Sequence, residues 1–521
     1  MTIGKDLYED IIDRLDIGNS IAEEDFLLEA ARVETPTFKG VLDDKYDIVL
    51  GRKGAGKTAI FRLLDLESEH LLSEKGLVIL SGVNSSGESI FKKFKDEFKT
   101  YKEEDFENFW KLYFISLIYN EFLKNPKFEA KLMPCKNEIN FFKNVCNKAG
   151  IPEIEAVQGI PKILALVASY ISDHKFKAPI VYDTKNGTLF GTLSVEPSDV
   201  KEKEQVNQSS IYIHDVGIAL SEILKKSGFK IWLILDRLDE VFDRYSEIEF
   251  NGLRGLLRAY KSFDIGNGEG KLKIKLFLRD DIKVFLTDDS TFSKYFPRKN
   301  LPPLPAATHI FAKESPTLSW SEDQIQQLIL NRLLNKRNVK LREYLGITET
   351  DKNVKENLRS EEIRKEYWNK IFPERISSSS SLKWIFSHLK DSNDIVTPRS
   401  VIDMLEGAID HQRKQLQTNF EDSQIVFPTE SLKEGIDIAS KHKLEKDVYN
   451  EFPNEQKYIK KLQKEGKFKL TKKELKRLFG AKWENIVDTL KKIGILRYIK
   501  FSDEYGIVYL FRPSLGISYR Y

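Results

Sequence analysis

The chain is poor in cysteine, methionine and histidine. Its 521 residues include 2 cysteines, 3 methionines and 7 histidines. The two thiols, Cys135 and Cys146, form no CxxC pair and cannot make a disulfide framework, which indicates a reducing compartment such as the cytoplasm. The histidines show neither HxxxH nor HExxH spacing. The sequence therefore predicts no structural metal.

Long apolar runs are also missing. The longest lies near residues 163–168, far short of the roughly 20 residues that a membrane-spanning helix needs. The N-terminal stretch MTIGKDLYEDIIDRLD is acidic and mixed, so it does not read as a signal peptide. We therefore expect a cytoplasmic protein with no membrane partner.

Charge is nearly balanced over the whole chain, at +3, but it is unevenly distributed. Residues 457–521 carry a net +11 and residues 1–456 a net −8. A basic end on a mildly acidic body favours a polyanion or an acidic protein surface as its partner. The alternative is an ordinary solvated, lysine-rich domain.

The most specific motif is GRKGAGKT, which matches the phosphate-binding pattern GxxxxGK[ST] in full. Glycines in such a loop let successive backbone N–H groups face a phosphate, and the following helix adds its dipole. The apolar stretch IVL precedes the motif and TAIFRLL follows it. The lysine would neutralise the β- and γ-phosphates of ATP, and the threonine hydroxyl would coordinate Mg²⁺. The predicted nucleotide-binding residues are Gly51, Arg52, Lys53, Gly54, Ala55, Gly56, Lys57 and Thr58.

An acidic partner for this loop is expected in the stretch IWLILDRLDE, residues 231–240. Asp236 ends a continuous apolar run and would hold Mg²⁺ through water, opposite Thr58. Asp239 and Glu240 follow, and either could orient or deprotonate the attacking water. The alternative is that both only cap the next helix.

These motifs resemble a known class of ATPases. The spacing of LILDRLDE is similar to the extended acidic motif of signal-transduction ATPases, the STAND class with its NACHT and KAP groups. With TPTFKGVLDDKYDIVLGRKGAGKTAIF and FLRDD, it resembles bacterial P-loop ATPases often linked to anti-phage defence. The resemblance covers scattered motifs within about residues 25–340 and does not extend to the segment between the two nucleotide motifs.

The resemblance implies two further arginines. In AAA+ and STAND sheets, the strand next to the acidic one carries a polar sensor for the γ-phosphate, and Arg279 follows the predicted strand 272–278. A salt bridge to Asp280, Asp281 or Asp236 is the alternative role for Arg279. In Thr397-Pro398-Arg399, threonine is expected as the N-cap and proline at the first helical position. Arg399 is then placed like the second sensor arginine of an AAA+ lid.

Apolar runs and turn signals predict the domain order. Strands are expected at 46–50, 77–80, 231–235 and 272–278, alternating with helices, which indicates an α/β P-loop NTPase with a parallel sheet and helices on both faces. A large, mainly helical insertion spans 96–210 and includes a hairpin at 179–195 around Asn186-Gly187. A helix is expected to begin at a capping box, Ser319–Glu322, and the serine run 377–381 is expected to be a flexible break. The predicted domains are 1–44, a helical segment; 45–305, the ATPase domain; 306–456, a helical lid; and 457–521, a basic winged helix.

The last domain reads as helix, turn, helix and hairpin. Thr471 and Glu474 form a capping box, Gly480 makes a turn, and a helix at 483–492 precedes strands at 495–499 and 507–511. This order is typical of a winged helix. If it binds DNA, its phosphate contacts would come from Lys472, Lys473, Lys476, Arg477, Lys491 and Lys492. In STAND-like ATPases the resembling module instead holds the nucleotide domain closed, and we favour that role because Glu484, Asn485 and Asp488 suit neither bases nor phosphates.

We therefore expect an ATP-hydrolysing switch that controls a protein effector encoded nearby. The main alternative is a DNA-binding ATPase, and a small-molecule kinase is a third. A homo-oligomer is compatible with each of these. A GTPase is disfavoured, because the sequence has no NKxD motif for guanine.

Overall fold

The computed structural model describes the backbone of residues 4–82, 95–123, 125–148, 174–177, 180–183, 188–197, 211–238, 240–263, 272–297, 299–304, 307–418 and 425–517. The chain divides into two compact units. One unit comprises residues 37–52 and 60–317, and the other comprises residues 1–36, 53–59 and 318–521. We call the first the sheet unit and the second the helical unit.

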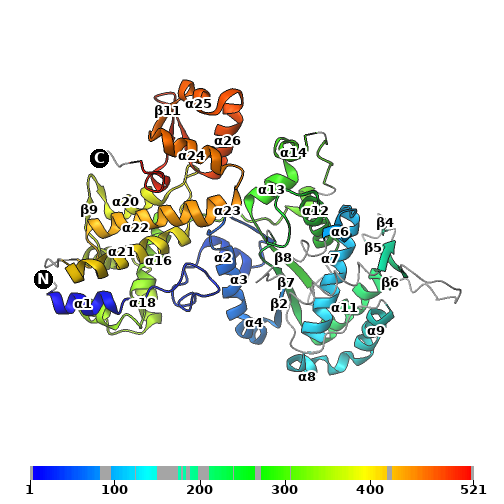
Figure 1. Cartoon of the computed structure of the whole chain (residues 1–521). Helices are drawn as coiled ribbons and strands as arrows, with labels where there is room; N and C mark the ends of the chain where they lie inside the picture. Colours follow the sequence, from blue (N-terminus) through cyan, green and yellow to red (C-terminus); the bar gives the residue numbers. More distant parts are fainter. Residues whose placement is uncertain are drawn as a thin grey trace. The chain divides into compact units, whose positions relative to one another are not determined.

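The sheet unit is built on a four-stranded parallel sheet with the strand order β1-β8-β7-β2. Its strands are β1 (Ile48–Leu50), β2 (Leu77–Gly82), β7 (Lys230–Leu235) and β8 (Leu272–Leu278). Figure 1 labels three of these strands, β8, β7 and β2. All four strands predicted from the sequence are confirmed, although β1 begins two residues later than expected. Because β8 lies between β1 and β7, the carboxyl ends of these three strands meet at one edge of the sheet.

Burial explains why these runs form strands. Every residue of β1 and β8 is buried, as expected where both faces of a parallel sheet are covered. Two of the buried residues in β8 are lysines, and a buried ammonium needs partners. Lys275 Nζ lies 3.0 Å from both Asp44 Oδ1 and Asp47 Oδ1, and Lys273 pairs with Asp44. These ion pairs fasten the segment before β1 to β8.

Helices cover both faces of the sheet. On one face, Phe61 of α3 (Lys57–Leu66) packs edge-on against Phe277, with ring centroids 6.3 Å apart. The other face is covered by α7 (Glu103–Leu117) and α12 (Glu247–Ser262), which lie side by side. Trp110 Nε1 donates to Gly252 O at 2.8 Å across this helix pair. A Cβ at Gly255 would lie 2.5 Å from Phe106 Cβ, so the close approach of α7 and α12 requires glycine there.

The other helices described in the sheet unit have 3 to 15 residues. They are α2 (Pro36–Leu42), α4 (Ser68–Lys75), α6 (Lys95–Phe98), η1 (Ile118–Leu123), η2 (Pro126–Phe128), α8 (Glu129–Leu132), η3 (Met133–Cys135), α9 (Lys136–Lys148), α11 (Ile213–Ser227), α13 (Asp280–Thr287), α14 (Asp289–Tyr295) and α15 (Ala307–Ile310). Helices α6 to α9 fall in the predicted insertion. So do the antiparallel strands β3 (His174–Lys177), β4 (Ile180–Asp183) and β5 (Thr188–Pro197), whereas β6 (Ile211–Tyr212), which pairs with β5, directly follows the predicted insertion. The β4–β5 hairpin confirms the predicted pairing, but its turn at Asn186-Gly187 lies outside the described residues.

The helical unit begins with α1 (Lys5–Asp13) and continues from residue 318. Its further helices are α16 (Glu322–Leu333), α17 (Val339–Leu345), α18 (Asp351–Asn357), α19 (Glu361–Ile371), α20 (Ser381–Leu389), α21 (Pro398–Thr418), α22 (Thr429–His442), η4 (Lys443–Val448) and α23 (Tyr449–Glu451). The predicted capping box at Ser319–Glu322 is wrong by two residues. Ser321 caps α16 by accepting from Gln324 N, and the Gln324 side chain accepts from Ser321 N.

The serine run 377–381 is ordered, so the predicted flexible break is wrong. Strands β9 (Arg375–Ile376) and β10 (Ser379–Ser380) pair antiparallel. Ser380 Oγ accepts from Lys383 N at 3.4 Å and so caps α20. Ser381 Oγ accepts from the buried Trp368 Nε1 at 2.8 Å. The serines thus make the turn and cap a helix.

Helix α21 has 21 residues and begins as predicted. Thr397 Oγ1 accepts from Ser400 N at 3.3 Å, which makes Thr397 the N-cap and Pro398 the first helical residue. Helix α22 crosses α21 closely, since a Cβ at Gly435 would lie 2.2 Å from Met404 O. Within the ranges described, no helix combines the length and the apolar character that crossing a membrane requires.

The chain ends in a small antiparallel sheet with the order β11-β13-β12, packed with three helices. The elements are α24 (Gln456–Glu465), β11 (Lys469–Thr471), α25 (Lys472–Phe479), η5 (Gly480–Lys482), α26 (Trp483–Ile493), β12 (Leu496–Ile499), β13 (Glu504–Ile507) and η6 (Tyr509–Phe511). The Thr471–Glu474 capping box is confirmed. The second predicted strand, 507–511, is misplaced: pairing ends at Ile507, and the buried Leu510 and Phe511 pack in a 3₁₀ turn against α20 and α22.

Candidate functional site

The GRKGAGKT loop joins β1 to α3, so the strand and the helix expected on either side of it are present. Gly51 N donates to Leu278 O at 3.2 Å, which continues the pairing of β1 with β8 by one residue. Gly54 has φ +77° and Gly56 has φ +106°. Residues other than glycine rarely adopt such backbone angles. The loop therefore needs glycine at these two positions in order to curl.

Lys57 and Thr58 are the first two residues of α3. Backbone N–H groups at a helix N-terminus have no partner within the helix and attract anions. The motif thus has its lysine and its hydroxyl where a helix dipole also favours a phosphate.

Within the helical unit, Trp320 contacts the loop directly. Trp320 Nε1 donates to Ala55 O at 2.9 Å, and a Cβ at Gly56 would lie 3.7 Å from Trp320 Cζ2. No pattern in the sequence indicates this contact, and Trp320 was considered only as part of the predicted cap at Ser319–Glu322.

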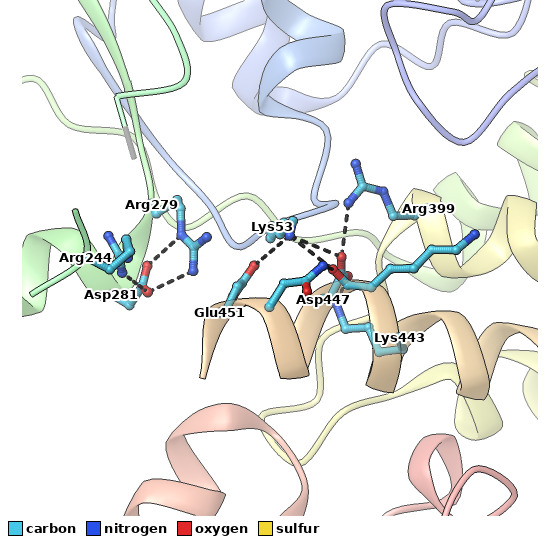
Figure 2. A network of polar contacts seen from close by, with 10 residues as sticks. Lys53, Arg244, Arg279, Asp281, Arg399, Lys443, Asp447 and Glu451 are labelled. Carbon is cyan, nitrogen blue, oxygen red and sulfur yellow. Dashed lines mark hydrogen bonds and ion pairs between the residues drawn. The ribbon is translucent and has the colours of Figure 1, made fainter. Parts of the chain in front are cut away.

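Also in the helical unit, three cationic side chains lie around the buried carboxylate of Asp447, and a second carboxylate, Glu451, contacts one of them, Lys53 (Figure 2). Arg399 Nη1 lies 3.2 Å from Asp447 Oδ1, and Lys443 Nζ lies 3.0 Å from Oδ2. Lys53 Nζ, from the loop, lies 3.7 Å from Asp447 Oδ1 and 3.4 Å from Glu451 Oε1. We call Lys53, Arg399, Lys443, Asp447 and Glu451 the Asp447 cluster. Asp447 and Glu451 were not predicted as site residues.

The charges of this cluster set the pKa of Asp447. Burial by itself would raise the pKa, but the cations of Lys443, Arg399 and Lys53 outweigh burial and hold it at about 2. Because this pKa lies below the usual value, the stabilisation is fully present above about pH 4 and is lost only as the pH falls towards 2. The carboxylate is therefore charged throughout the physiological range.

In the sheet unit, Asp236 directly follows β7 and its side chain is buried. Arg237 turns the chain with φ +58°, and its Nη1 lies 3.4 Å from Glu240 Oε2. Glu240 does not cap the next helix, because Ser246 Oγ caps α12 by accepting from Glu249 N at 3.0 Å. Asp239 lies outside the described residues. The catalytic role of Glu240 stays a prediction.

Arg279 follows β8, the strand next to the acidic one, and is 6% exposed. Its guanidinium donates two hydrogen bonds of 2.9 Å to Asp281, from Nε to Oδ1 and from Nη2 to Oδ2 (Figure 2). Asp281 Oδ2 also accepts from Arg244 Nη2 at 2.8 Å. The salt bridge considered as the alternative role of Arg279 is thus present. It also fixes the guanidinium, so a sensor role stays a prediction.

Gly51, Asp236 and Arg279 follow the carboxyl ends of β1, β7 and β8, so the fold brings them to one edge of the sheet. Ligands of open α/β sheets bind at this edge. The predicted magnesium ligands, the Thr58 hydroxyl and the Asp236 carboxylate, are oxygen donors of the kind that Mg²⁺ prefers. Their chemistry fits the ion.

A scan of the sequence against protein-family models found no match, and a search of curated proteins found no similar sequence.

Proposed function

We propose that the protein binds ATP with Mg²⁺ at Gly51–Thr58 and Asp236 and hydrolyses it. The observation that carries this proposal is the loop itself: a full GxxxxGK[ST] match between a buried strand and a helix, with its glycines at φ +77° and +106°. Calorimetric titration of the protein with ATP tests it. We expect binding that strengthens with Mg²⁺, and no binding of ATP in either condition would contradict the proposal.

The strand order supports the class of ATPase. β8 lies between β1 and β7 and is followed directly by Arg279, as the resemblance to AAA+ and STAND sheets leads us to expect of a sensor strand. We assign the chain an α/β P-loop NTPase domain, a helical lid in residues 306–456 and a C-terminal winged helix in residues 457–521. In this assignment Arg399 belongs to the lid and Arg279 to the sheet.

Replacement of Arg279 tests its sensor role. We expect Arg279→Ala to weaken ATP binding by about ten-fold or more, the size of a lost charge-assisted hydrogen bond, and to leave ADP binding nearly unchanged. Parallel titrations with a slowly hydrolysed ATP analogue and with ADP measure this. Arg244→Ala is the matched control, since it also removes a partner of Asp281. If Arg279→Ala weakened the binding of ATP and ADP equally, the role of Arg279 would be the structural salt bridge to Asp281 alone.

For the basic C-terminal domain we favour a regulatory role over DNA binding. Three of the six predicted phosphate-contacting residues have carboxylate partners within the domain: Lys472 with Asp503, Arg477 with Glu465 and Lys491 with Asp488. The end of α26 is also docked on the loop before α21. Ser392 N donates to Gly494 O at 2.7 Å, and Arg497 Nη2 lies 2.8 Å from Asp394 Oδ1. The domain therefore contacts the proposed lid, and a switch ATPase acting on a protein effector fits this contact.

Charge variants separate the two roles without deleting a domain that shares its hydrophobic core with the lid. We expect the full-length protein to bind duplex DNA only weakly at physiological salt, and Arg497→Ala to change the ATPase rate several-fold by loosening the lid contact. The comparison variant, Lys473→Glu/Lys476→Glu/Lys492→Glu, reverses three exposed charges and should leave the ATPase rate unchanged. Gel shifts and phosphate release measure both.

The opposite pattern would favour the DNA-binding ATPase. Its signature is tight binding to duplex DNA that falls steeply with salt, disappears in the triple lysine variant and is accompanied by an unchanged ATPase rate in Arg497→Ala.

A further inference from the structure

We propose that Asp447 is a specificity-determining residue of the nucleotide site, because its carboxylate competes with the terminal phosphate of ATP for Lys53 and Arg399. This inference rests on the proposed function. It assigns a role to a residue that belongs to neither nucleotide motif, and it predicts that the chain itself opposes ATP binding.

The first support is geometric. Lys53 and Arg399 come from segments far apart in the sequence, yet both lie near the same atom, Asp447 Oδ1, at 3.7 and 3.2 Å (Figure 2). Both residues are also at the phosphate loop. Lys53 belongs to the loop, and a Cβ at Gly54 would lie 3.2 Å from Arg399 Cβ. Asp447 therefore presents an anion to two cations at the loop.

The second support is chemical. Guanidinium and ammonium groups bind phosphate and carboxylate oxygens through the same charge-assisted hydrogen bonds. A terminal phosphate carries more negative charge than one carboxylate, so it can replace Asp447. The exchange has a cost, because a buried carboxylate that loses its partners is destabilised. If the third phosphate of ATP is the group that reaches these cations, its contacts offset this cost. ADP has no third phosphate and would leave Asp447 in place.

The third support is the position of Asp447 in the helical unit. Asp447 and Glu451 are four residues apart, one helical turn, and both contact Lys53. They lie at the end of a continuous helical run, α22–η4–α23, in which η4 is a π-helix. Such turns are rare and are often found at functional sites. α24, the first helix of the basic C-terminal domain, begins at Gln456. Release of Asp447 would thus free the segment that leads into this domain.

The experiment compares nucleotide affinities of full-length Asp447→Asn and the unchanged protein. The asparagine keeps the shape and removes the charge. We expect the affinity for a slowly hydrolysed ATP analogue to rise about ten-fold, as when a charge-assisted contact no longer competes, and the affinity for ADP to stay the same. Glu445→Gln is the matched control, because Glu445 is an exposed carboxylate on the same turn. It should change neither affinity.

Two further variants keep the test decisive. If Asp447→Asn does not fold, Glu451→Gln removes the second carboxylate from Lys53 and should raise ATP affinity in the same direction, by less. In a Lys53→Met/Arg399→Ala background, Asp447→Asn should have no further effect on ATP, since the contested cations are gone.

A fall in ATP affinity in Asp447→Asn would overturn the inference, because Asp447 would then position Arg399 for the nucleotide. An unchanged ATP affinity, or an equal rise for ATP and ADP, would also overturn it. Failure of the proposed function is a different result: the unchanged protein would bind no ATP at all.

Discussion

Lys57→Ala is expected to abolish ATP binding. The lysine is the first residue of α3 and closes the GRKGAGKT loop, where its ammonium would contact the β- and γ-phosphates. Loss of two or more charge-assisted hydrogen bonds should weaken binding by about 100-fold or more. Titration of a fluorescent ATP analogue measures the effect. An affinity equal to that of the unchanged protein would remove the basis for assigning the loop.

Lys53 is not expected to compensate for the loss of Lys57. Its ammonium lies 3.4 Å from Glu451 Oε1 and 3.7 Å from Asp447 Oδ1, so it must leave these carboxylates before it can bind a phosphate. Lys45→Ala is a suitable control for Lys57→Ala. The Lys45 side chain is 68% exposed and makes a 3.5 Å pair with Asp43 at the surface, and its loss should leave ATP affinity unchanged.

Glu240→Gln is expected to bind ATP normally and to hydrolyse it about 10²–10⁴-fold more slowly, the usual contribution of a general base. An amide cannot accept the proton of the attacking water. The Glu240 side chain is 45% exposed, so the substitution should not disturb the fold. Single-turnover phosphate release from pre-bound ATP separates the loss of chemistry from any change in affinity.

The comparison with Asp239→Asn identifies which acid acts. Normal turnover in Glu240→Gln together with slow turnover in Asp239→Asn would move the role to Asp239. Normal turnover in both would show that the extended acidic motif was misread. Glu104→Gln, at a carboxylate 76% exposed on α7, controls for the loss of one negative charge.

The sequence predicted the elements that depend on neighbouring residues: the strands, two helix caps and the glycine-rich loop. The four parallel strands are continuous apolar runs, and such runs are buried wherever the sheet is covered on both faces. The caps at Thr397 and Thr471 followed from hydrogen bonds three residues along the chain. The position of the GRKGAGKT loop between a strand and a helix was predicted because its glycines and the flanking apolar stretches are contiguous in sequence.

The errors have a different origin. Trp320 and Asp447 contact the loop although hundreds of residues separate them from it in the sequence. No periodicity or spacing therefore indicates these contacts. The start of α16 is shifted by two residues because Ser321 and Gln324, and not Ser319 and Glu322, form the capping box. The burial of Lys273 and Lys275 in β8 likewise depends on partners distant in sequence, Asp44 and Asp47. At residues 507–511 the apolar pattern was real, but it reflected packing against α20 and α22 and not strand pairing.

The long reach of the loop's contacts has a consequence for synthesis on the ribosome. Lys53 Nζ donates to Lys446 O at 3.4 Å across a separation of 393 residues, and β1 pairs with β8, which ends at Leu278. At a translation rate of about 5–20 residues per second, roughly 20–80 s pass between the emergence of Lys53 and that of Lys446. A nascent chain therefore carries its glycine-rich loop for most of its synthesis without the carboxylates that later hold Lys53. Chains that stop before residue 446 would have the phosphate-binding motif but not the acid that we propose restrains it.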